Sequence, residues 1–224
     1  MFQRTRLWRR KPLTSRQHIA GGALAALLAS LASVSAADDE PSPALSWNCA
    51  GCHGTDGASA GPMVPSIAGM DPRYFMHLMQ DFKQGERYST IMGRIAGGYG
   101  LLELREMARF FAGREWVPAR VAAEADLVAA GATIHEEHCA ECHEDAGRYQ
   151  DKEIPRLAGQ WPAYLLSQLL DYRTERVQMP QPDKMRNRLA KLSDADLAAV
   201  SAYYGQVDAT KALAQDETAN GDSH

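Results

Sequence analysis

Cysteine is scarce in this sequence. The 224 residues include four cysteines, and all four fall within two short stretches, so none is left over for a disulfide framework. The sequence also lacks strand-like segments, because no stretch alternates apolar and polar residues as a half-buried strand requires. These absences exclude a disulfide-stapled scaffold and a β fold, and they predict an all-α protein.

Long hydrophobic runs are missing too. The one extended run, residues 19–34, has 16 small and apolar residues, which is short for a bilayer span of about 20. It follows residues 1–18, which hold six basic and no acidic residues, and it ends at Val34-Ser35-Ala36, a small-x-small cleavage pattern. We therefore expect residues 1–36 to be a cleaved export signal and the mature protein to be periplasmic. The alternative is an uncleaved membrane anchor.

Basic residues become scarce once this leader is removed. The whole chain has 24 basic and 28 acidic residues, and loss of the six leader residues leaves 18 against 28, a net charge of −10. Such a protein is not built to bind nucleic acid or an anionic membrane surface. It suits instead a partner with a basic docking face.

The four cysteines occur in two copies of one pattern, CAGCH at residues 49–53 and CAECH at residues 139–143. A CxxC pair followed at once by histidine is the attachment pattern of c-type haem, in which both sulfurs bond the porphyrin and the histidine ligates the iron. A four-cysteine zinc site would need no histidine after either pair, and it would have to join pairs 90 residues apart. The pattern therefore predicts two covalently bound haem c groups, held by Cys49, Cys52, Cys139 and Cys142, with His53 and His143 as proximal iron ligands.

The segments that follow the two motifs are copies of one another. An offset of 90 residues superposes residues 64–69 (VPSIAG) on residues 154–159 (IPRLAG), and it holds from the haem motif through about thirty residues. This internal duplication predicts two homologous haem domains, residues 37–117 and 118–206, with the boundary in the proline-containing segment 113–119. The polar residues 207–224 have no pattern and are expected to form a disordered tail.

Helical patterns recur at matching places in both copies. Each copy has a helix that opens with proline in its first turn and a closing helix with apolar residues three or four apart. A further helix leads into the second motif. The expected helices are residues 72–85, 101–112, 122–138, 162–173 and 193–204.

An electron carrier closes the sixth position of its iron, usually with a methionine thioether that favours Fe(II). In the first copy Met92 lies in the glycine-rich segment 89–100, which we expect to be a loop against the haem. In the second copy Met185 follows His143 by 42 residues, against 39 from His53 to Met92. We prefer Met185 as the second sixth ligand, and Met179, at 36 residues, stays as the alternative.

A proline recurs twelve residues after each proximal histidine, Pro65 after His53 and Pro155 after His143. A proximal imidazole needs an acceptor on its other ring nitrogen to fix its tautomer and orientation. The recurrence predicts that a backbone carbonyl at each proline turn supplies that acceptor.

The chain resembles a known family in the segments that carry these features. LAGQWPAYLLSQLLDYR in the second copy is similar to dihaem cytochromes of the c4 type. PSIAGMDPRYFMHLMQDFKQGERYSTIMGRIAGGYG (residues 65–100) closely resembles the cytochrome subunit of flavocytochrome c sulfide dehydrogenase. The resemblance covers nearly all of residues 42–205.

This resemblance implies two tandem c-type cytochrome domains related by pseudo-twofold symmetry. It also implies a periplasmic flavoprotein partner that holds FAD and oxidises sulfide, and a soluble cytochrome c that accepts the electrons. No catalytic residue of its own is expected on this chain, because every cysteine is used for haem. Carried over by position, the iron ligands are His53 and Met92, then His143 and Met185.

Two other functions fit the same motifs. A free dihaem carrier to a terminal oxidase would have the same haems and no stable flavoprotein partner. A dihaem peroxidase or thiosulfate-oxidising cytochrome would need one haem with an open sixth position, or with a histidine or cysteine in place of methionine. Carbon monoxide binding to the reduced protein separates that enzyme class from a carrier with two methionine-ligated haems.

Overall fold

The computed structural model describes residues 43–174 and 179–208, all of which lie in one compact unit. These residues form helices and connecting segments without a strand, which confirms the all-α fold class. The expected leader, residues 1–36, and all but the first two residues of the expected tail lie outside the described residues. Within the described part of the chain, no helix is long and apolar enough to cross a bilayer.

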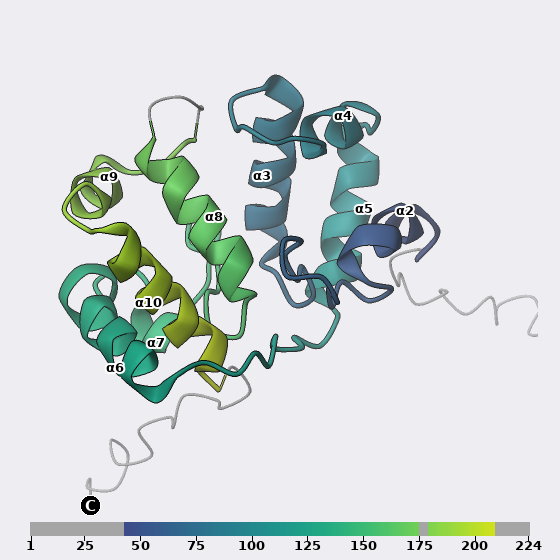
Figure 1. The fold of residues 1–224 in the computed structure, drawn as a ribbon. Helices are drawn as coiled ribbons and strands as arrows, with labels where there is room; N and C mark the ends of the chain where they lie inside the picture. Colours follow the sequence, from purple (N-terminus) through teal and green to yellow (C-terminus); the bar gives the residue numbers. More distant parts are fainter. Residues whose placement is uncertain (1–42, 175–178, 209–224) are drawn as a thin grey trace, which may run out of the picture. The chain divides into compact units, whose positions relative to one another are not determined.

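The helices form two groups that follow one another along the chain (Figure 1). In the first group α3 packs against α4 and α5, and α2 packs against α5. In the second group α10 packs against α6 and α8, and α8 packs against α9. The first group consists of α2 (Pro43–His53), α3 (Pro72–Gln84), α4 (Met92–Gly97) and α5 (Leu101–Ala112). The second consists of α6 (Ala125–Ile134), the π-helix η1 (His135–Cys139), α7 (Glu144–Gly147), α8 (Pro162–Arg173), α9 (Asp183–Leu189) and α10 (Asp194–Gln206).

Local sequence signals explain where the long helices begin and end. Asp71 caps α3 by accepting hydrogen bonds from the backbone N–H groups of Arg73 and Tyr74, and Gly85 ends it in the left-handed conformation with φ 75°. Ser193 and Asp196 form a reciprocal capping box at the start of α10. The expected helix ranges 72–85, 101–112, 162–173 and 193–204 are therefore confirmed to within a residue or two at each end.

One local expectation was wrong, and a second was right in kind but not in its details. The segment 89–100 is not a plain loop, because residues 92–97 form the helix α4. In its first turn Gly93 N–H donates a hydrogen bond to Ser89 Oγ (2.9 Å), and Ala96 is fully buried. The helix expected over 122–138 begins at residue 125, and its last turn widens into η1, where His135 is buried. Packing of these side chains into the core overrides the local signal in both places.

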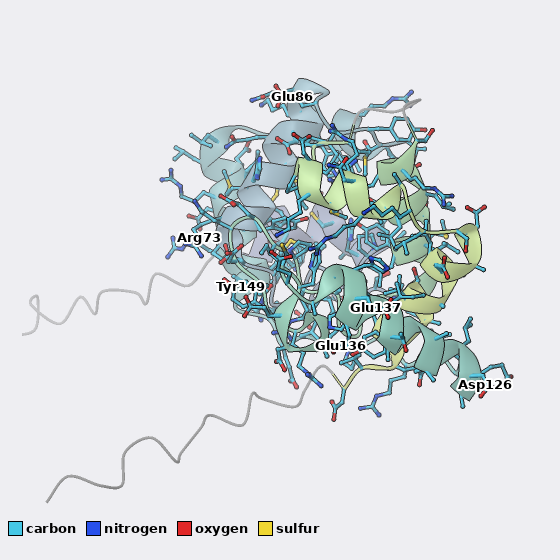
Figure 2. The ribbon with its side chains drawn as sticks, turned by 90° about the vertical axis from the view of Figure 1, so that its left-hand side faces the viewer. Arg73, Glu86, Asp126, Glu136, Glu137 and Tyr149 are labelled. Atoms are coloured by element: carbon cyan, nitrogen blue, oxygen red, sulfur yellow. The ribbon has the colours of Figure 1, made fainter. Side chains whose placement is uncertain are left out.

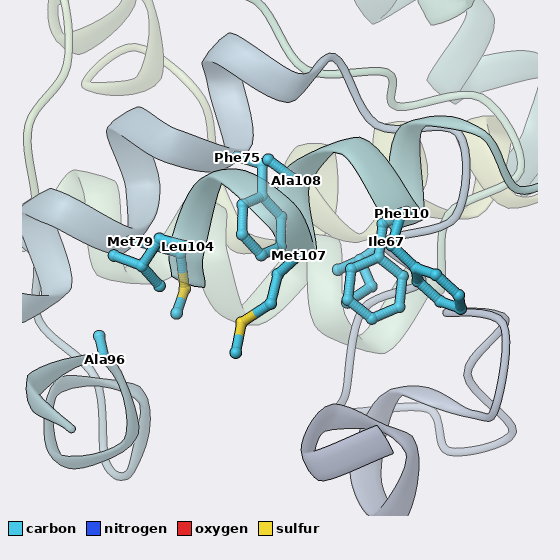
Figure 3. Packing of buried hydrophobic residues seen from close by; sticks show 9 residues of the cluster. Ile67, Phe75, Met79, Ala96, Leu104, Met107, Ala108 and Phe110 are labelled. Atoms are coloured by element: carbon cyan, nitrogen blue, oxygen red, sulfur yellow. The ribbon is translucent and has the colours of Figure 1, made fainter. Parts of the chain in front are cut away.

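Each group of helices has its own core. In the first group Phe75 and Met79 of α3 pack with Leu104 and Met107 of α5 (Figure 3). In Figure 3 the Met107 side chain points toward the side of the cluster where Ala96 of α4 lies. In the second group the corresponding cores lie along α8 and α10 and include Leu165, Leu197, Val200 and Tyr204.

Side chains of the second group reach backbone groups of the first. Gln160 accepts a hydrogen bond from Ser66 N–H (2.9 Å) and donates one to Ser66 O (3.0 Å), and Trp161 Nε1 donates to Ser59 O (3.1 Å). Ser66 and Gln160 are buried, so loss of either partner would leave unpaired polar groups in the interior. We call the set of contacts between the two helix groups the seam.

Candidate haem centres

The first motif lies at the end of α2. Cys49 and Cys52 are three residues apart, so they share one face of the helix, with Cys52 exposed and Cys49 partly buried against the first core. His53 is the last residue of the helix and is buried. One turn of helix therefore presents two thiols and an imidazole together, as covalent haem attachment requires.

The His53 ring is oriented by the expected backbone acceptor. Its Nδ1 lies 2.8 Å from the Pro65 carbonyl oxygen. A carbonyl only accepts, so Nδ1 carries the proton and Nε2 keeps its lone pair for a metal. Burial lowers the pKa of His53, against the opposing effect of the Pro65 bond, so the ring is neutral at pH 7. This tautomer fits iron ligation.

The second motif begins at the end of η1. The His143 N–H donates to Cys139 O (3.0 Å), which places the histidine one turn beyond the first cysteine. Burial, the largest cause, and the nearby His135 together lower the pKa of His143 to about 4, against the opposing effect of the Pro155 carbonyl. The buried Nδ1 has no hydrogen bond of ordinary geometry, so the Pro155 contact is less well formed than that of Pro65 and its role stays a prediction.

The cysteine side chains agree with haem attachment and not with the zinc alternative. None of the four cysteines forms a disulfide, and each motif has one exposed and one partly buried cysteine. Within residues 43–174 and 179–208, no group of three or more histidine, cysteine or acidic residues converges on a possible metal position. The two CxxC pairs lie in the two different helix groups, at the ends of α2 and η1, as two separate haem motifs require.

The methionine expected in the first centre lies in the first turn of α4. Met92 is partly buried and packs against the same core cluster as Cys49. In the second centre Met185 lies on α9 and packs against the cluster of Leu189, Leu192 and Leu197. Met179 is buried ahead of α9. Met179 is thus buried and Met185 partly buried, and burial alone does not choose between them.

Repeated hydrogen bonds fix how the two domains align. The Gly57 carbonyl accepts from Ile67 N–H (2.7 Å), and 90 residues further on Gly147 accepts from Leu157 N–H in the same way (2.8 Å). Gly57 and Gly147 both adopt a left-handed φ, 82° and 80°. The offset of 90 residues found in the sequence is therefore reproduced by backbone hydrogen bonds in the loop that follows each motif.

The offset changes by the time the closing helix is reached. Gly69 N–H donates to Phe111 O (2.7 Å), and Gly159 N–H donates to Tyr204 O (2.8 Å). Phe111 and Tyr204 are 93 residues apart, so the second copy carries three extra residues between the paired bonds. The same offset of 93 relates Met92 to Met185, which supports Met185 over Met179 as the second sixth ligand. Ligation itself stays a prediction.

Two seam residues were not found from the sequence. Gln160 joins Ser66 across 94 positions, and Arg87 joins the second domain across 81 and 85 positions. No local pattern marks a glutamine or an arginine for burial, since both residue types are mostly exposed in proteins.

Comparisons with known proteins agree with this geometry. The Cytochrome c family matches residues 128–208. Cytochrome c4 of Azotobacter vinelandii is 34% identical over 175 residues, which cover 69% of this chain and 82% of that protein. The cytochrome subunit of sulfide dehydrogenase of Chlorobaculum tepidum is 51% identical over 67 residues, 30% of this chain and 60% of that subunit. The crystal structure of reduced recombinant cytochrome c4 from Pseudomonas stutzeri superposes with a TM-score of 0.67 at 27% identity and covers 74% of this chain and 96% of that one.

These features define a c-type cytochrome with two tandem haem domains, a class of protein that transfers electrons. The two CxxCH motifs accordingly carry covalently bound haem c. The chain belongs to the cytochrome c4 family. A haem bound in this way accepts and releases one electron at its iron, while the protein sets the orientation of the ligands and the electrostatic environment.

Proposed function

We propose that this chain is the electron-transfer subunit of a periplasmic, sulfide-oxidising flavoprotein and passes electrons on to a soluble cytochrome c. The observation that carries the proposal is the 51% identity over 67 residues with a sulfide dehydrogenase cytochrome subunit, against 34% with the cytochrome c4 of Azotobacter vinelandii. The chain spans 60% of that subunit's length, so the match covers part of the subunit only.

Two haems suit a flavin donor. A reduced flavin gives up two electrons and each haem takes one, so a dihaem chain drains the flavin completely. FAD would be bound by the partner alone, and sulfide oxidation would take place there. The described residues of this chain would supply the orientation of the proximal histidines and the contacts that hold the two centres in one molecule.

The surroundings of the two motifs differ in charge, which supports a different partner for each. Residues 43–66 contain one acidic residue, Asp56, and no lysine or arginine. Two large apolar side chains near this motif, Trp47 and Met63, are 61% and 57% exposed. An uncharged face with exposed apolar side chains is typical of a lasting protein interface, so we assign the first centre to the flavoprotein.

The second motif is surrounded by acidic residues. Glu136 and Glu137 of η1 have exposed side chains and flank the motif on its amino-terminal side (Figure 2). Glu144 follows the motif directly, whereas Glu141 within the motif forms ion pairs with Lys184 and Arg188 of α9 and adds little to the acidic surface. Acidic surfaces attract basic partners over long distances and speed their encounter, so we assign this centre to a basic soluble cytochrome.

Charge reversal tests the second assignment. The double variant Glu136→Lys and Glu137→Lys should slow electron transfer to a basic cytochrome c by about tenfold at low ionic strength, because steering contributes 10-fold to 10³-fold to such rates. The difference should vanish as salt screens it. Glu86→Lys, which reverses one exposed charge of the first domain (Figure 2), is the control matched to the single variant Glu136→Lys and should leave the rate unchanged. Equal slowing by the two single variants would argue that only net charge matters.

A free dihaem carrier is the second candidate, since the cytochrome c4 match covers more of the chain than the sulfide dehydrogenase match does. The experiment that separates the two is purification of the untagged protein from its native cells, followed by addition of sulfide. A flavin-bearing chain in stoichiometric amount, with rapid reduction of both haems by sulfide, is the expected result. A protein that purifies alone, and that sulfide reduces no faster than an unrelated cytochrome c, would establish the free carrier instead.

A further inference from the structure

Arg87 is buried at the seam between the two domains. It lies just after α3 and is 6% exposed, and it is the only lysine or arginine in the buried class among the described residues. Its guanidinium carbon lies 5.7 Å from the centre of the Phe82 ring and 5.3 Å from that of the Tyr172 ring. The cation is thus enclosed between an aromatic ring of each domain.

Two hydrogen bonds of the guanidinium cross the seam to α8. Nη1 donates to Tyr172 Oη (2.8 Å) and Nη2 donates to Gln168 Oε1 (2.8 Å), both on α8. Figure 1 shows α3 and α8 side by side. A guanidinium has five N–H groups, and both of these acceptors are uncharged. The second domain therefore holds the cation without neutralising it.

The acceptors belong to the second copy alone. The 90-residue offset places Leu78 on Gln168 and Phe82 on Tyr172, so the first copy has apolar side chains where the second has oxygen atoms. The arginine comes from one domain and its acceptors come from the other. The arrangement serves the contact between two different domains, and the internal packing of either domain does not require it.

No counter-ion for Arg87 occurs in the described part of the chain. No carboxylate of the described residues forms an ion pair with Arg87. The charged forms of Tyr172, Tyr164 and Tyr74 have the largest electrostatic effects on its pKa. Burial raises the pKa of Tyr74, and it raises the pKa of Tyr164 to about 12, so these phenols are neutral at pH 7. Burial acts to lower the pKa of Arg87 and the hydrogen bond to Tyr172 acts to raise it, and the side chain stays cationic at pH 7 because the pKa of a guanidinium lies far above that pH.

Asp171 lies close enough to Arg87 for the cation to affect the pKa of its carboxyl group. The two side chains do not form an ion pair. Burial raises the pKa of Asp171, and Arg87 opposes that shift from beyond contact distance. A buried charge without a partner is strongly unfavourable, whereas a charge paired with a hydrogen-bonded ion of opposite sign is tolerated. Among residues 43–174 and 179–208 no carboxylate forms an ion pair with Arg87, so its buried position favours a bound anion as its counter-ion.

We propose that the counter-ion of Arg87 is a carboxylate of bound haem c, and that this pair makes Arg87 the residue that sets a haem reduction potential at the seam. Haem c brings two ionised propionate groups, which are the anions this protein gains when it matures. An electron that enters the iron adds negative charge, and a fixed cation in a poorly screened site favours that state. The inference does not depend on which protein donates the electrons.

Three variants of the holoprotein test the proposal. Arg87→Gln removes the charge and keeps hydrogen-bonding capacity. Arg87→Lys keeps the charge and loses the forked geometry. Gln168→Leu removes a seam acceptor, keeps the charge, and restores the residue type found at the matching position of the first copy. Potentiometric titration gives both one-electron potentials, and thermal unfolding reports the loss of seam contacts in each variant.

Arg87→Gln should weaken reduction of at least one haem about tenfold, which is a fall of about 59 mV for one electron. Arg87→Lys should keep the haem reduction potentials close to the parent values, and Gln168→Leu should leave them unchanged. Both of these variants should be less stable to heat than the parent protein. Redox-induced infrared difference spectra should show shifted haem carboxylate bands in Arg87→Gln and unshifted bands in Gln168→Leu.

The proposal is overturned if the variants lose stability while the haem reduction potentials stay unchanged. If Arg87→Gln and Gln168→Leu lower the unfolding temperature alike, and both potentials stay at the parent values, Arg87 is a hydrogen-bonding link and no more. If Arg87→Gln yields no folded protein, the Lys variant decides. If Arg87→Lys has the parent potentials and unshifted carboxylate bands, the charge of residue 87 is what matters, which supports the ion pair. If reduction of a haem is weakened tenfold in Arg87→Lys, the forked shape of the guanidinium is what matters instead.

Discussion

Alanine in place of Met185 is expected to make the reduced protein bind one carbon monoxide molecule per chain. The parent protein should bind little, because both irons are expected to carry a methionine. Loss of the thioether should also lower the potential of the second haem by about 0.2 V, within the range of ≈ 0.8 V that axial ligands span. Carbon monoxide titration of the reduced protein and potentiometry measure the two effects.

Met179→Ala is the matched control, since it removes the same side chain from the alternative ligand position. Met179 is buried, so its loss should destabilise the fold by about 2–5 kcal/mol through the cavity it leaves. It should leave the reduced protein closed to carbon monoxide. An open haem in Met179→Ala and a closed one in Met185→Ala would show that the offset of 93 residues does not extend to the ligand.

Met92→Ala should open the first haem in the same way. The double variant with Met185→Ala should then bind two carbon monoxide molecules, because the two centres lie in separate domains. This count also tests the peroxidase-type reading. A parent protein that already binds one molecule per chain would have an open haem, as an enzyme of that class requires.

Local chemistry made most of the helices predictable. Asp71, Pro72 and Gly85 mark the two ends of α3 by capping, by a fixed φ and by a left-handed termination, and each of these signals acts within a few residues. Ser193 and Asp196 do the same for α10. The haem motifs were readable for a similar reason, because attachment chemistry requires the cysteines and the histidine to be adjacent in the sequence.

The parts that sequence reasoning missed depend on distant contacts. Glycines at positions 93 and 97 disfavour a helix, yet α4 forms because Ala96 is buried in the first core and Ser89 bonds its first turn. The contacts of the seam could not be predicted from the sequence for the same reason. Gln160 and Arg87 are defined by partners 81 to 94 residues away, and nothing in their own neighbourhood sets them apart from exposed residues.

Gly131 marks the close crossing of α6 and α10, where one added methyl group is expected to destabilise the fold. A Cβ atom at this position would lie 2.1 Å from the Ala199 carbonyl oxygen and 2.6 Å from its carbon. Both are backbone atoms inside α10, so no side-chain rotation can relieve the clash. The helices would have to move apart, and this would disturb η1 and the second haem motif that follows it.

Gly131→Ala should therefore lower the free energy of unfolding by about 1–3 kcal/mol, as overpacking in a core does, in spite of the gain of up to about 1 kcal/mol that alanine brings to a helix. Gly97→Ala is the control, because it makes the same chemical change on the helix α4 with no atom within 4 Å of the new Cβ. It should be neutral or slightly stabilising. Denaturant unfolding of both haem-loaded variants gives the two signs directly. A destabilisation shared equally by the two would place the effect in the backbone conformation and would remove the close helix crossing as its cause.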